Sequence, residues 1–463
     1  MRSALSTFNE VWQQQFRTGF LSQLQSFSAQ TQFLIGCSGG MDSMLLLHLM
    51  SVLCPEKIRA IYIDHQLQAG SAAWGAFVSE QCQLRNIPCI IQPVHVAAGN
   101  LEDQARNARY QAYQQHLAGN EVLVLAHHQQ DQAETLILRL LSGAGIHGLA
   151  AMQAVDQREH VTIWRPLLDI SREQICQWAA DLHIQNIEDP TNQDTQYDRA
   201  WCRETLWPVL QSRYPKMQQA ISRTSYLMQD AEDILSDVLA QDMVSCGTFE
   251  CIQLHELAKL SQPRRRQLLS HWMKGQSQYR PSFDMVQRIV HEVIEAKADA
   301  QAALHWNGNY YVRFAEQLHR LPKAEYLQAQ QTVQANQIQL RNLASHQTLH
   351  LLAGDFVIQQ MADSMGLSYT LLEKELKLST RRGGEKIHLH GRVGTWPLKK
   401  AIQQAQIFPW QRHTIQILSI DNVMLGVFTP KGFWLAESPY CVAQGWQPAL
   451  NFSVKNSTSG LES

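Results

Sequence analysis

A glycine-rich turn is the segment of this sequence best suited to phosphate chemistry. It follows the apolar run Thr31–Gly36 and reads Cys37-Ser38-Gly39-Gly40-Met41-Asp42-Ser43. Glycines let the backbone turn tightly and expose its N–H groups, and a helix that begins there adds positive potential. Ser38 and Ser43 offer hydroxyl donors, whereas the Asp42 carboxylate suits a phosphate only when a cation such as Mg²⁺ intervenes. The turn predicts a phosphate-binding loop. The alternative is a plain strand-to-helix turn in which Asp42 and Ser43 cap the helix.

Other nucleotide-binding patterns are absent or misplaced. The Walker A pattern G-x-x-x-x-G-K-[ST] does not occur in the sequence. A G-x-G-x-x-G pattern occurs at Gly143, Gly145 and Gly148, but it follows a helical segment rather than a strand. We interpret these glycines as the loop after a helix, not as a dinucleotide-binding turn.

A second group of polar residues follows the apolar run Glu121–Ala126. His127, Asp131 and Glu134 are spaced so that they share one face if a helix begins here. Carboxylates at the start of a helix can hold a cation or an ammonium group. The alternative is that they only complement the helix dipole and that the histidines are structural.

Four arginines could supply positive charge to the same site. Arg106 and Arg109 lie three residues apart in a helical pattern and could bind a phosphate or a carboxylate. Taken alone, a solvated helix face is the simpler interpretation of this pair. Arg199 and Arg203 follow residues 188–192, where an Asp-Pro pair breaks the preceding helix and could order a substrate-facing loop.

These groups must be positioned by the strands and helices that alternate in the N-terminal part of the chain. Apolar runs predict strands at Thr31–Gly36, Ile58–Asp64, Pro88–Val94 and Glu121–His127. Apolar residues at three- and four-residue spacing predict helices at Asp42–Leu53, Ala73–Asn86, Leu101–Leu117 and Asp131–Leu141. The predicted fold class is α/β, with a parallel sheet covered by helices on both faces and ligands at the carboxyl ends of its strands.

The rest of the chain predicts further regions. We expect a catalytic domain over 1–214, a mainly helical domain over 215–345, a small basic α+β domain over 346–452 and a disordered tail over 453–463. In the second region we predict a hairpin turn at Asn307-Gly308. Helices are predicted there at Met217–Met243, Pro263–Lys274 and Pro281–Lys297.

Composition narrows the class of protein. The 463 residues are 45% hydrophobic and 17% charged with a formal net charge of −2, which excludes a uniformly basic nucleic-acid coat. Apolar runs are far shorter than the roughly 20 residues needed to span a bilayer. Nine scattered cysteines form no C-x-x-C pair, which favours reduced thiols over disulfides or a metal cluster. We expect a soluble cytoplasmic protein with no membrane partner.

Together these motifs resemble the tRNA(Ile)-lysidine synthase family of the N-type ATP pyrophosphatase (PP-loop) superfamily. The resemblance rests on SGGMDS at 38–43, IDHQL at 63–67, E-x-x-A-R-x-x-R-Y at 102–110, HHQQDQAET at 127–135, SGAGIHGL at 142–149 and EDPTN at 188–192. It covers about residues 30–210 and continues more weakly over 381–412.

The resemblance implies an ATP-dependent ligase that forms a carbon–nitrogen bond. Members of the family attach L-lysine to C2 of the wobble cytidine in the CAU anticodon of an isoleucine tRNA. The C2 oxygen is first adenylated by ATP with release of pyrophosphate, and the lysine ε-amine then displaces AMP. The product reads AUA instead of AUG and carries isoleucine identity instead of methionine identity. The implied cofactors are ATP and Mg²⁺.

The resemblance also assigns roles to residues of this chain. Asp42, Asp131 and Glu134 would be catalytic, with Asp42 and Asp131 as Mg²⁺ ligands and Asp131 or Glu134 binding the lysine amine or accepting its proton. Lysine or phosphate would be contacted by Arg106, Arg109 and His127. ATP would be bound by Ser38, Gly39, Gly40, Met41, Asp42 and Ser43.

Three positions depart from the family pattern. Gln130 stands where an aspartate is usual, and because a neutral amide is a poor metal ligand, Asp131 would carry more of that role. Ala200 replaces the usual asparagine after Arg199. Residues 384–386 read GEK instead of GDR, which keeps the charge pattern but loses a bidentate guanidinium.

The segment from Glu373 to Arg412 is locally basic. It holds nine lysines and arginines against three glutamates in a chain that is negative overall, which suits contact with RNA phosphates. Trp396 and Trp410 could stack on bases, and the alternative is a solvated surface with buried tryptophans. The residues expected to bind tRNA are Arg199, Arg203, Arg381, Arg382, Lys399 and Lys400.

Two other functions remain open from the sequence. A tRNA 2-thiolase with the same loop would need reactive cysteine pairs or an iron–sulfur cluster, and Cys37 in the loop is the single thiol to test. A non-catalytic RNA-binding relative would account for Gln130 but not for the intact phosphate loop. The oligomeric state is also open, with a homodimer as one option.

Overall fold

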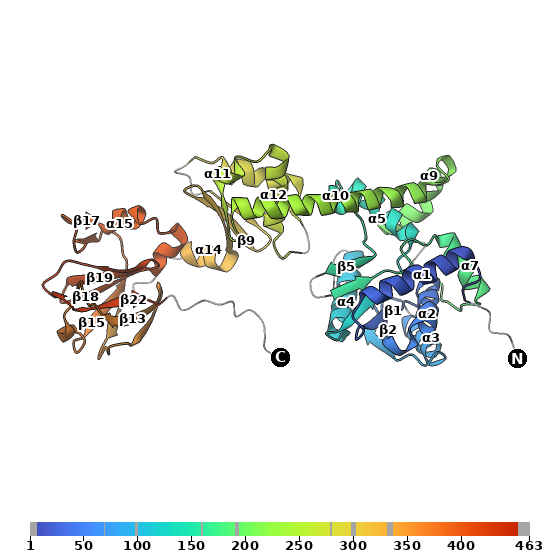
Figure 1. The fold of residues 1–463 in the computed structure, drawn as a ribbon, viewed down its shortest axis with the longest axis horizontal. Coiled ribbons are helices and arrows are strands. Elements are labelled where there is room, and N and C mark those ends of the chain that lie inside the picture. Colours follow the sequence, from blue (N-terminus) through green and yellow to red (C-terminus); the bar gives the residue numbers. More distant parts are fainter. Residues whose placement is uncertain are drawn as a thin grey trace. The chain divides into compact units, whose positions relative to one another are not determined.

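The structure is a computed structural model that describes residues 7–68, 70–97, 101–158, 161–189, 194–277, 280–297, 302–330 and 337–451. It consists of two compact units, Met1–Gln241 and Asp242–Ser463 (Figure 1). The expected tail 453–463 lies outside the described residues, and the domain boundaries after 214 and 345 stay predictions.

A six-stranded sheet forms the centre of the first unit, in the order β3-β2-β1-β4-β6-β5. All neighbouring strands pair in parallel except the edge strand β5, which is antiparallel to β6. The four predicted strands and their parallel pairing are therefore confirmed. The strands are β1 (Gln32–Gly36), β2 (Ile58–Asp64), β3 (Cys89–Pro93), β4 (Glu121–Val124), β5 (Val155–Arg158) and β6 (Val161–Trp164).

Helices cover both faces of this sheet, because side chains of a buried strand alternate between two cores. Phe33 and Ile35 of β1 belong to the core on one face, whereas Leu34 between them packs with Tyr113 in the core on the other. Tyr113 comes from α4 (Leu101–His116), and the first core is covered by α1 (Val11–Ser26), α2 (Met41–Leu53), α3 (Ser71–Gln83) and α7 (Arg172–Asp181). The predicted doubly covered α/β fold is confirmed (Figure 1).

The strand order reverses at β1, which lies between β2 and β4. Ile35 near the end of β1 is opposite Val124 at the end of β4 in the parallel register. Because both strands end at the same edge of the sheet, the turn after Gly36 and the segment after β4 are neighbours. This reversal brings the two polar groups of the sequence to one place.

The segment after β4 becomes helix α5, which begins before the predicted start at Asp131. Ala133 and Ile137 of α5 pack with Cys202, Trp207 and Met217 in a small apolar cluster. This packing places residues 198–213, which include Arg199 and Arg203, against α5. The helical elements concerned are α5 (Gln129–Leu141), α6 (Ile146–Leu149), α8 (Asp198–Trp201), a π-helical turn (Cys202–Leu206), α9 (Trp207–Arg213) and α10 (Met217–Cys246).

The second unit begins with a four-stranded antiparallel sheet in the order β7-β10-β9-β8, packed with short helices. The predicted hairpin turn is confirmed, because Asn307 and Gly308 join β8 to β9 with φ angles of 45° and 74°. The elements are β7 (Cys251–Gln253), α11 (Leu254–Leu257), α12 (Gln262–Lys274), α13 (Phe283–Arg288), a π-helical turn (Ile289–Ile294), β8 (Ala303–Trp306), β9 (Asn309–Phe314), β10 (Gln317–Pro322) and α14 (Lys323–Gln330).

Two five-stranded antiparallel sheets follow and enclose a core that contains Phe356, Phe428 and Trp446. One sheet comprises β11 (Gln337–Leu340), β15 (Leu376–Thr380), β18 (Gln416–Ile420), β19 (Val423–Thr429) and β20 (Gly432–Leu435). The other comprises β12 (Thr348–Leu351), β13 (Gly354–Gln360), β22 (Trp446–Leu450), β14 (Met365–Leu367) and β21 (Cys441–Ala443). Between β15 and β18 lie β16 (Lys386–Ile387), β17 (Trp396–Pro397) and α15 (Leu398–Gln404).

An aromatic cluster joins these sheets to the four-stranded sheet. Phe408 and Trp410 stack at 4.9 Å, and the His319 ring lies 4.8 Å from Phe408 and 4.9 Å from Trp410. Trp410 is only 6% exposed, so the suggestion that it stacks on RNA bases is wrong. Sequence alone did not show that this tryptophan is used for packing within the unit.

None of the described helices combines the length and the apolar character that crossing a membrane requires.

The buried histidine of this cluster predicts a pH-dependent stability. Burial lowers the pKa of His319 from 6.5 to about 4, and its Nε2 has no protein partner among the described residues. The unfolded chain therefore binds the proton at a higher pH than the folded chain. Stability present above pH 6.5 should fall as the pH drops toward 4, by up to about 3 kcal/mol.

In the variant His319→Leu the free energy of unfolding should change less between pH 7 and pH 4 than in the wild type, as measured by urea unfolding at several pH values in this range. His346→Leu is the matched control, because His346 is exposed and should leave the profile unchanged. An unchanged slope in His319→Leu would show that another group causes the pH dependence.

Candidate active site

The turn after β1 needs glycine at its centre for two reasons. Gly39 has φ +86°, a conformation that favours glycine, and a Cβ built there would lie 2.9 Å from Ile187 Cδ1. Its carbonyl also accepts a hydrogen bond of 2.9 Å from the Ile187 N–H. The turn is thus fixed from the outside by the segment that precedes residue 188.

The start of α2 exposes donors in the way that a phosphate loop requires. The Ser43 hydroxyl donates to the Gly40 carbonyl at 2.8 Å, and Gly40 N–H donates to the Ser38 hydroxyl at 3.3 Å. The first helical hydrogen bond runs from Met44 N–H to Gly40 O. The N–H groups of residues 41–43 therefore precede the helical ladder and can be offered to an anion, as the sequence predicted for this loop.

The two predicted metal ligands both lie within 4 Å of the His128 ring. Asp42 Oδ2 is 3.9 Å from His128 Nε2, and Asp131 Oδ2 is 3.5 Å from the same nitrogen. The residues come from different helices, α2 and α5, which the adjacent ends of β1 and β4 bring together. Both carboxylates approach the same ring nitrogen, and their role as Mg²⁺ ligands stays a prediction.

His128 was not among the candidates taken from the sequence, yet its hydrogen bonds order the start of α5. Its Nδ1 accepts the Gln130 N–H at 3.2 Å, and its own N–H donates to Asp131 Oδ2 at 3.0 Å, so it caps α5. Because Nδ1 is an acceptor, a neutral ring carries its proton on Nε2, the atom that faces Asp42 and Asp131.

The Asp131 carboxyl remains ionised despite its surroundings. Burial alone would raise its pKa, but His128, His127 and Arg199, with the hydrogen bond from the His128 N–H, hold the pKa below its ordinary value. Asp131 is therefore an anion at neutral pH, as a metal ligand or an ammonium partner must be.

His127 has the opposite character. Burial lowers its pKa well below the ordinary value, and nearby arginines lower it further while Asp131 opposes them. Its Nδ1 is buried and has no partner among the residues that the structure describes. A neutral ring with one unsatisfied nitrogen fits the predicted ligand contact, which stays a prediction.

Arg172 is a second residue that the sequence analysis missed. Its guanidinium forms an ion pair with Asp42 from the first turn of α7. The Ser171-x-x-Gln174 capping box marks a helix start in the sequence, but no local pattern shows that Arg172 faces the phosphate loop.

Glu134 is fully buried and is held by Arg203. Arg203 Nε and Nη2 each donate to one carboxylate oxygen at 3.0 Å, and the Gln130 amide donates to Oε1 at 3.1 Å. A carboxylate in place of Gln130 would be repelled by Glu134, so the departure at this position has a structural partner. Glu134 fixes Arg203, and its predicted part in proton transfer stays a prediction.

Arginines distant in the sequence gather beside these groups. The Arg106 and Arg158 guanidinium groups lie 5.2 and 5.6 Å from the Tyr110 ring. Burial lowers the pKa of Arg106, and the positive charges of Arg158, Arg109 and Arg199 lower it further. The predicted Arg106, Arg109 and Arg199 are thus brought together, and such an excess of positive charge suits an anion.

Some expected features do not lie in this site or fall outside the described residues. Cys37 is buried, and burial raises the pKa of its thiol far above the ordinary value, so it lacks the reactive thiolate that a 2-thiolase needs. Residues 190–193 of the proposed substrate-facing loop lie outside the described residues.

The predicted tRNA-binding residues of the second unit lie mostly on its surface. Arg382, Lys399 and Lys400 are exposed, and Lys400 Nζ lies 5.0 Å from the Trp396 ring centre. Arg381 is half-buried with Nε 3.7 Å from Glu385. These placements leave three of the four cations free to meet a polyanion.

The Glu134–Arg203 pair predicts a strong coupling. Glu134→Gln should lower the free energy of unfolding by about 2–3 kcal/mol, because it leaves Arg203 without its buried counter-charge. Adding Arg203→Met should recover part of this loss, as measured by urea unfolding of both single variants and the double variant. Strictly additive effects would contradict the coupling.

Comparison with known proteins identifies the family to which the chain belongs. Residues 12–210 match the PP-loop domain family, residues 253–319 the TilS substrate binding domain and residues 376–443 the TilS substrate C-terminal domain. The tRNA(Ile)-lysidine synthase of Acinetobacter baylyi is 62% identical over 97% of this chain and 97% of its own length. That of Shigella flexneri is 33% identical over 91% of this chain and 97% of its own. The chain belongs to the tRNA(Ile)-lysidine synthase family, whose catalytic domain is a PP-loop, ATP-utilising domain.

Proposed function

We propose that this chain is the ligase that joins L-lysine to C2 of the wobble cytidine in the CAU anticodon of an isoleucine tRNA. ATP is consumed, AMP and pyrophosphate are released, and the codon read changes from AUG to AUA. The observation that carries this proposal is the convergence of Asp42 and Asp131 beside the phosphate loop. The membership of this chain in the tRNA(Ile)-lysidine synthase family supports the choice of substrates.

The first chemical step is the attack of the cytidine C2 oxygen on the α-phosphate of ATP. The bond to the β-phosphate breaks and pyrophosphate leaves. The N–H groups of residues 41–43 and the Ser38 hydroxyl would hold the departing phosphates. Mg²⁺, held by Asp42 and Asp131, would neutralise charge on the phosphates.

The second step forms the carbon–nitrogen bond. The lysine ε-ammonium must lose a proton before its nitrogen attacks C2 and AMP departs. Asp131 is an anion in a largely buried position and can bind the ammonium or take its proton. The lysine carboxylate or a substrate phosphate would meet the charge of Arg106 and Arg109.

Binding of the tRNA would use cations of both units. Arg199 and Arg203 belong to the catalytic unit, whereas Arg381, Arg382, Lys399 and Lys400 belong to the second unit. Contacts to phosphates position a nucleic acid without reading its sequence. We place the reaction in the cytoplasm, and the proposal requires no particular oligomeric state.

Asp42 provides the most direct test of the chemistry. Asp42→Asn should lower the transfer of labelled lysine to an unmodified isoleucine tRNA transcript by about 100-fold or more, because it removes a charged metal ligand. Glu56→Gln is the control, because Glu56 is exposed just before β2, at the opposite ends of the strands. A methionine tRNA with the same anticodon should receive no label. Full activity in Asp42→Asn would refute the proposed site.

The basic surface predicts a separation of binding from catalysis. Arg382→Ala and Lys399→Ala should each raise KM for tRNA, while kcat changes little. Each should also reduce the slope of log binding constant against log salt concentration by about one. Lys57→Ala is the control, because Lys57 Nζ donates to the Ala29 carbonyl far along the chain from this surface. An unchanged salt slope in both variants would remove these residues from the tRNA interface.

A further inference from the structure

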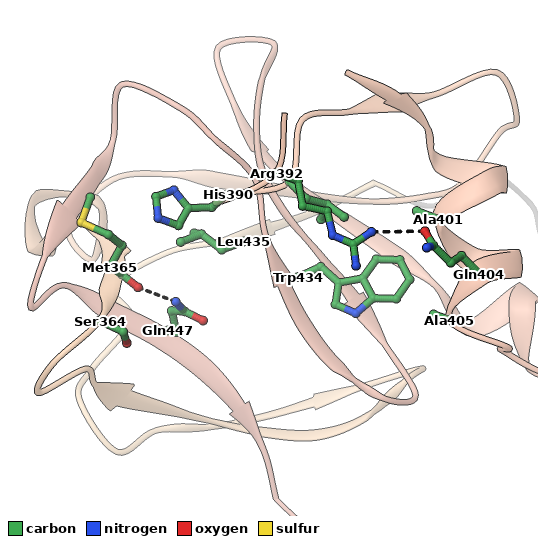
Figure 2. Close-up of a pocket in the computed structure, with 11 residues that line it drawn as sticks. Ser364, Met365, His390, Arg392, Ala401, Gln404, Ala405, Trp434, Leu435 and Gln447 are labelled. Atoms are coloured by element: carbon green, nitrogen blue, oxygen red, sulfur yellow. Dashed lines mark hydrogen bonds between the residues drawn. The ribbon is translucent and has the colours of Figure 1, made fainter. Parts of the chain in front are cut away.

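A cavity of about 500 Å³ lies in the second unit, beside the two five-stranded sheets. His390, Arg392 and Trp434 line it together with Met365 and Gln447, as Figure 2 shows. The proposed ligase reaction does not use this region. His390 is of interest because its ring also lies beside two other side chains of types that can bind a metal ion.

Three different donor types gather at His390. One ligand atom from each of His390, Glu437 and Cys441 lies within 4.8 Å of the other two. The closest pair is His390 Nδ1 and Glu437 Oε2, at 2.6 Å. The side chains of His390 and Cys441 are partly buried, whereas Glu437 is exposed.

Backbone hydrogen bonds fix the three residues independently of any metal. His390 N–H donates to Leu435 O at 3.0 Å, and Glu437 N–H donates to His388 O at 2.7 Å, on either side of a bridge between residues 389 and 436. Cys441 pairs with Leu367 where β21 meets β14. The donors therefore come from two stretches of chain, one around His390 and one from Glu437 to Cys441, whose main chains are already held in place.

We propose that His390, Glu437 and Cys441 form a zinc site. An imidazole nitrogen, a carboxylate oxygen and a thiolate sulfur are all zinc ligands, and the thiolate disfavours Mg²⁺ and Ca²⁺. Tetrahedral zinc separates its ligand atoms by about 3.5 Å, so the donors need to move by about an ångström. A water molecule would complete the four ligands.

Binding has a defined proton balance. The Cys441 thiol loses its proton to solvent when the sulfur–zinc bond forms. The His390 proton that faces Glu437 from Nδ1 moves to Nε2, so that the hydrogen bond is replaced by two bonds to the metal. No electron is transferred. The sulfur is already turned toward Ala436 O, 3.2 Å away, on the segment that carries Glu437.

Zinc at this site would stabilise the second unit by linking separate segments. Glu437 follows β20 of one sheet, Cys441 begins β21 of the other, and His390 precedes the exposed residues 391–395. Zinc would thus tie both sheets to the segment that carries Arg392. This inference is independent of the proposed ligase function, since it concerns the stability of this unit.

The first measurement is binding of ZnCl₂ to the full chain, purified without a metal-binding tag and kept reduced. Calorimetry and elemental analysis should give one zinc per chain, and Co²⁺ should give the absorption band of a thiolate–cobalt bond. Cys441→Ser should abolish this band and weaken zinc binding by about tenfold or more. Zinc should also raise the Tm of the wild type but not that of the variant.

Two control variants separate this site from non-specific binding. Cys176→Ser removes an exposed thiol elsewhere, and His350→Ala removes an exposed histidine that pairs with Asp355 at 2.8 Å. Both should keep the cobalt band and the zinc affinity. His390→Gln serves as a second site variant if Cys441→Ser fails to fold, and it should also lose affinity. Zinc binding that survives both site variants, or a band that depends on Cys176, would overturn the proposal.

Discussion

The arrangement of the catalytic unit depends on the parallel pairing of β1 with β4. This pairing places the phosphate loop beside the start of α5, so that Asp42 and Asp131 both approach His128 Nε2. Neither carboxylate could be placed by its own helix alone. A parallel sheet whose strand order reverses at this point is therefore the condition on which the proposed chemistry depends.

Two groups of charged side chains lie near this point, and they differ in how their charge is offset. Glu134 is buried and compensated by Arg203, so this pair is a fixed part of the wall. Near Arg106 the pKa of the guanidinium is lowered by burial and further by the charges of Arg158, Arg109 and Arg199, although Arg158 pairs with Asp156 at 3.0 Å. The Glu134–Arg203 pair is a fixed internal contact, whereas the group around Arg106 is where the proposed function places an anionic part of the substrate.

The second unit separates packing from surface charge. Its aromatic residues Phe408, Trp410 and His319 are used between sheets, which removes Trp410 from the set that could meet RNA. The cations of α15 stay exposed on the outside. The stretch from α15 to Trp410 thus supplies both an aromatic contact inside the unit and a basic surface.

The sequence by itself determined the α/β class, the phosphate loop and the candidates Asp42 and Asp131, because these depend on local periodicity and on spacing within one turn. It could not determine that His128 and Arg172 face Asp42, that Arg203 pairs with Glu134 or that Trp410 is buried. Those facts depend on contacts between segments far apart in the chain. Only the tertiary structure decides them, because sheet pairing and helix packing, not local propensity, bring such side chains within hydrogen-bonding distance.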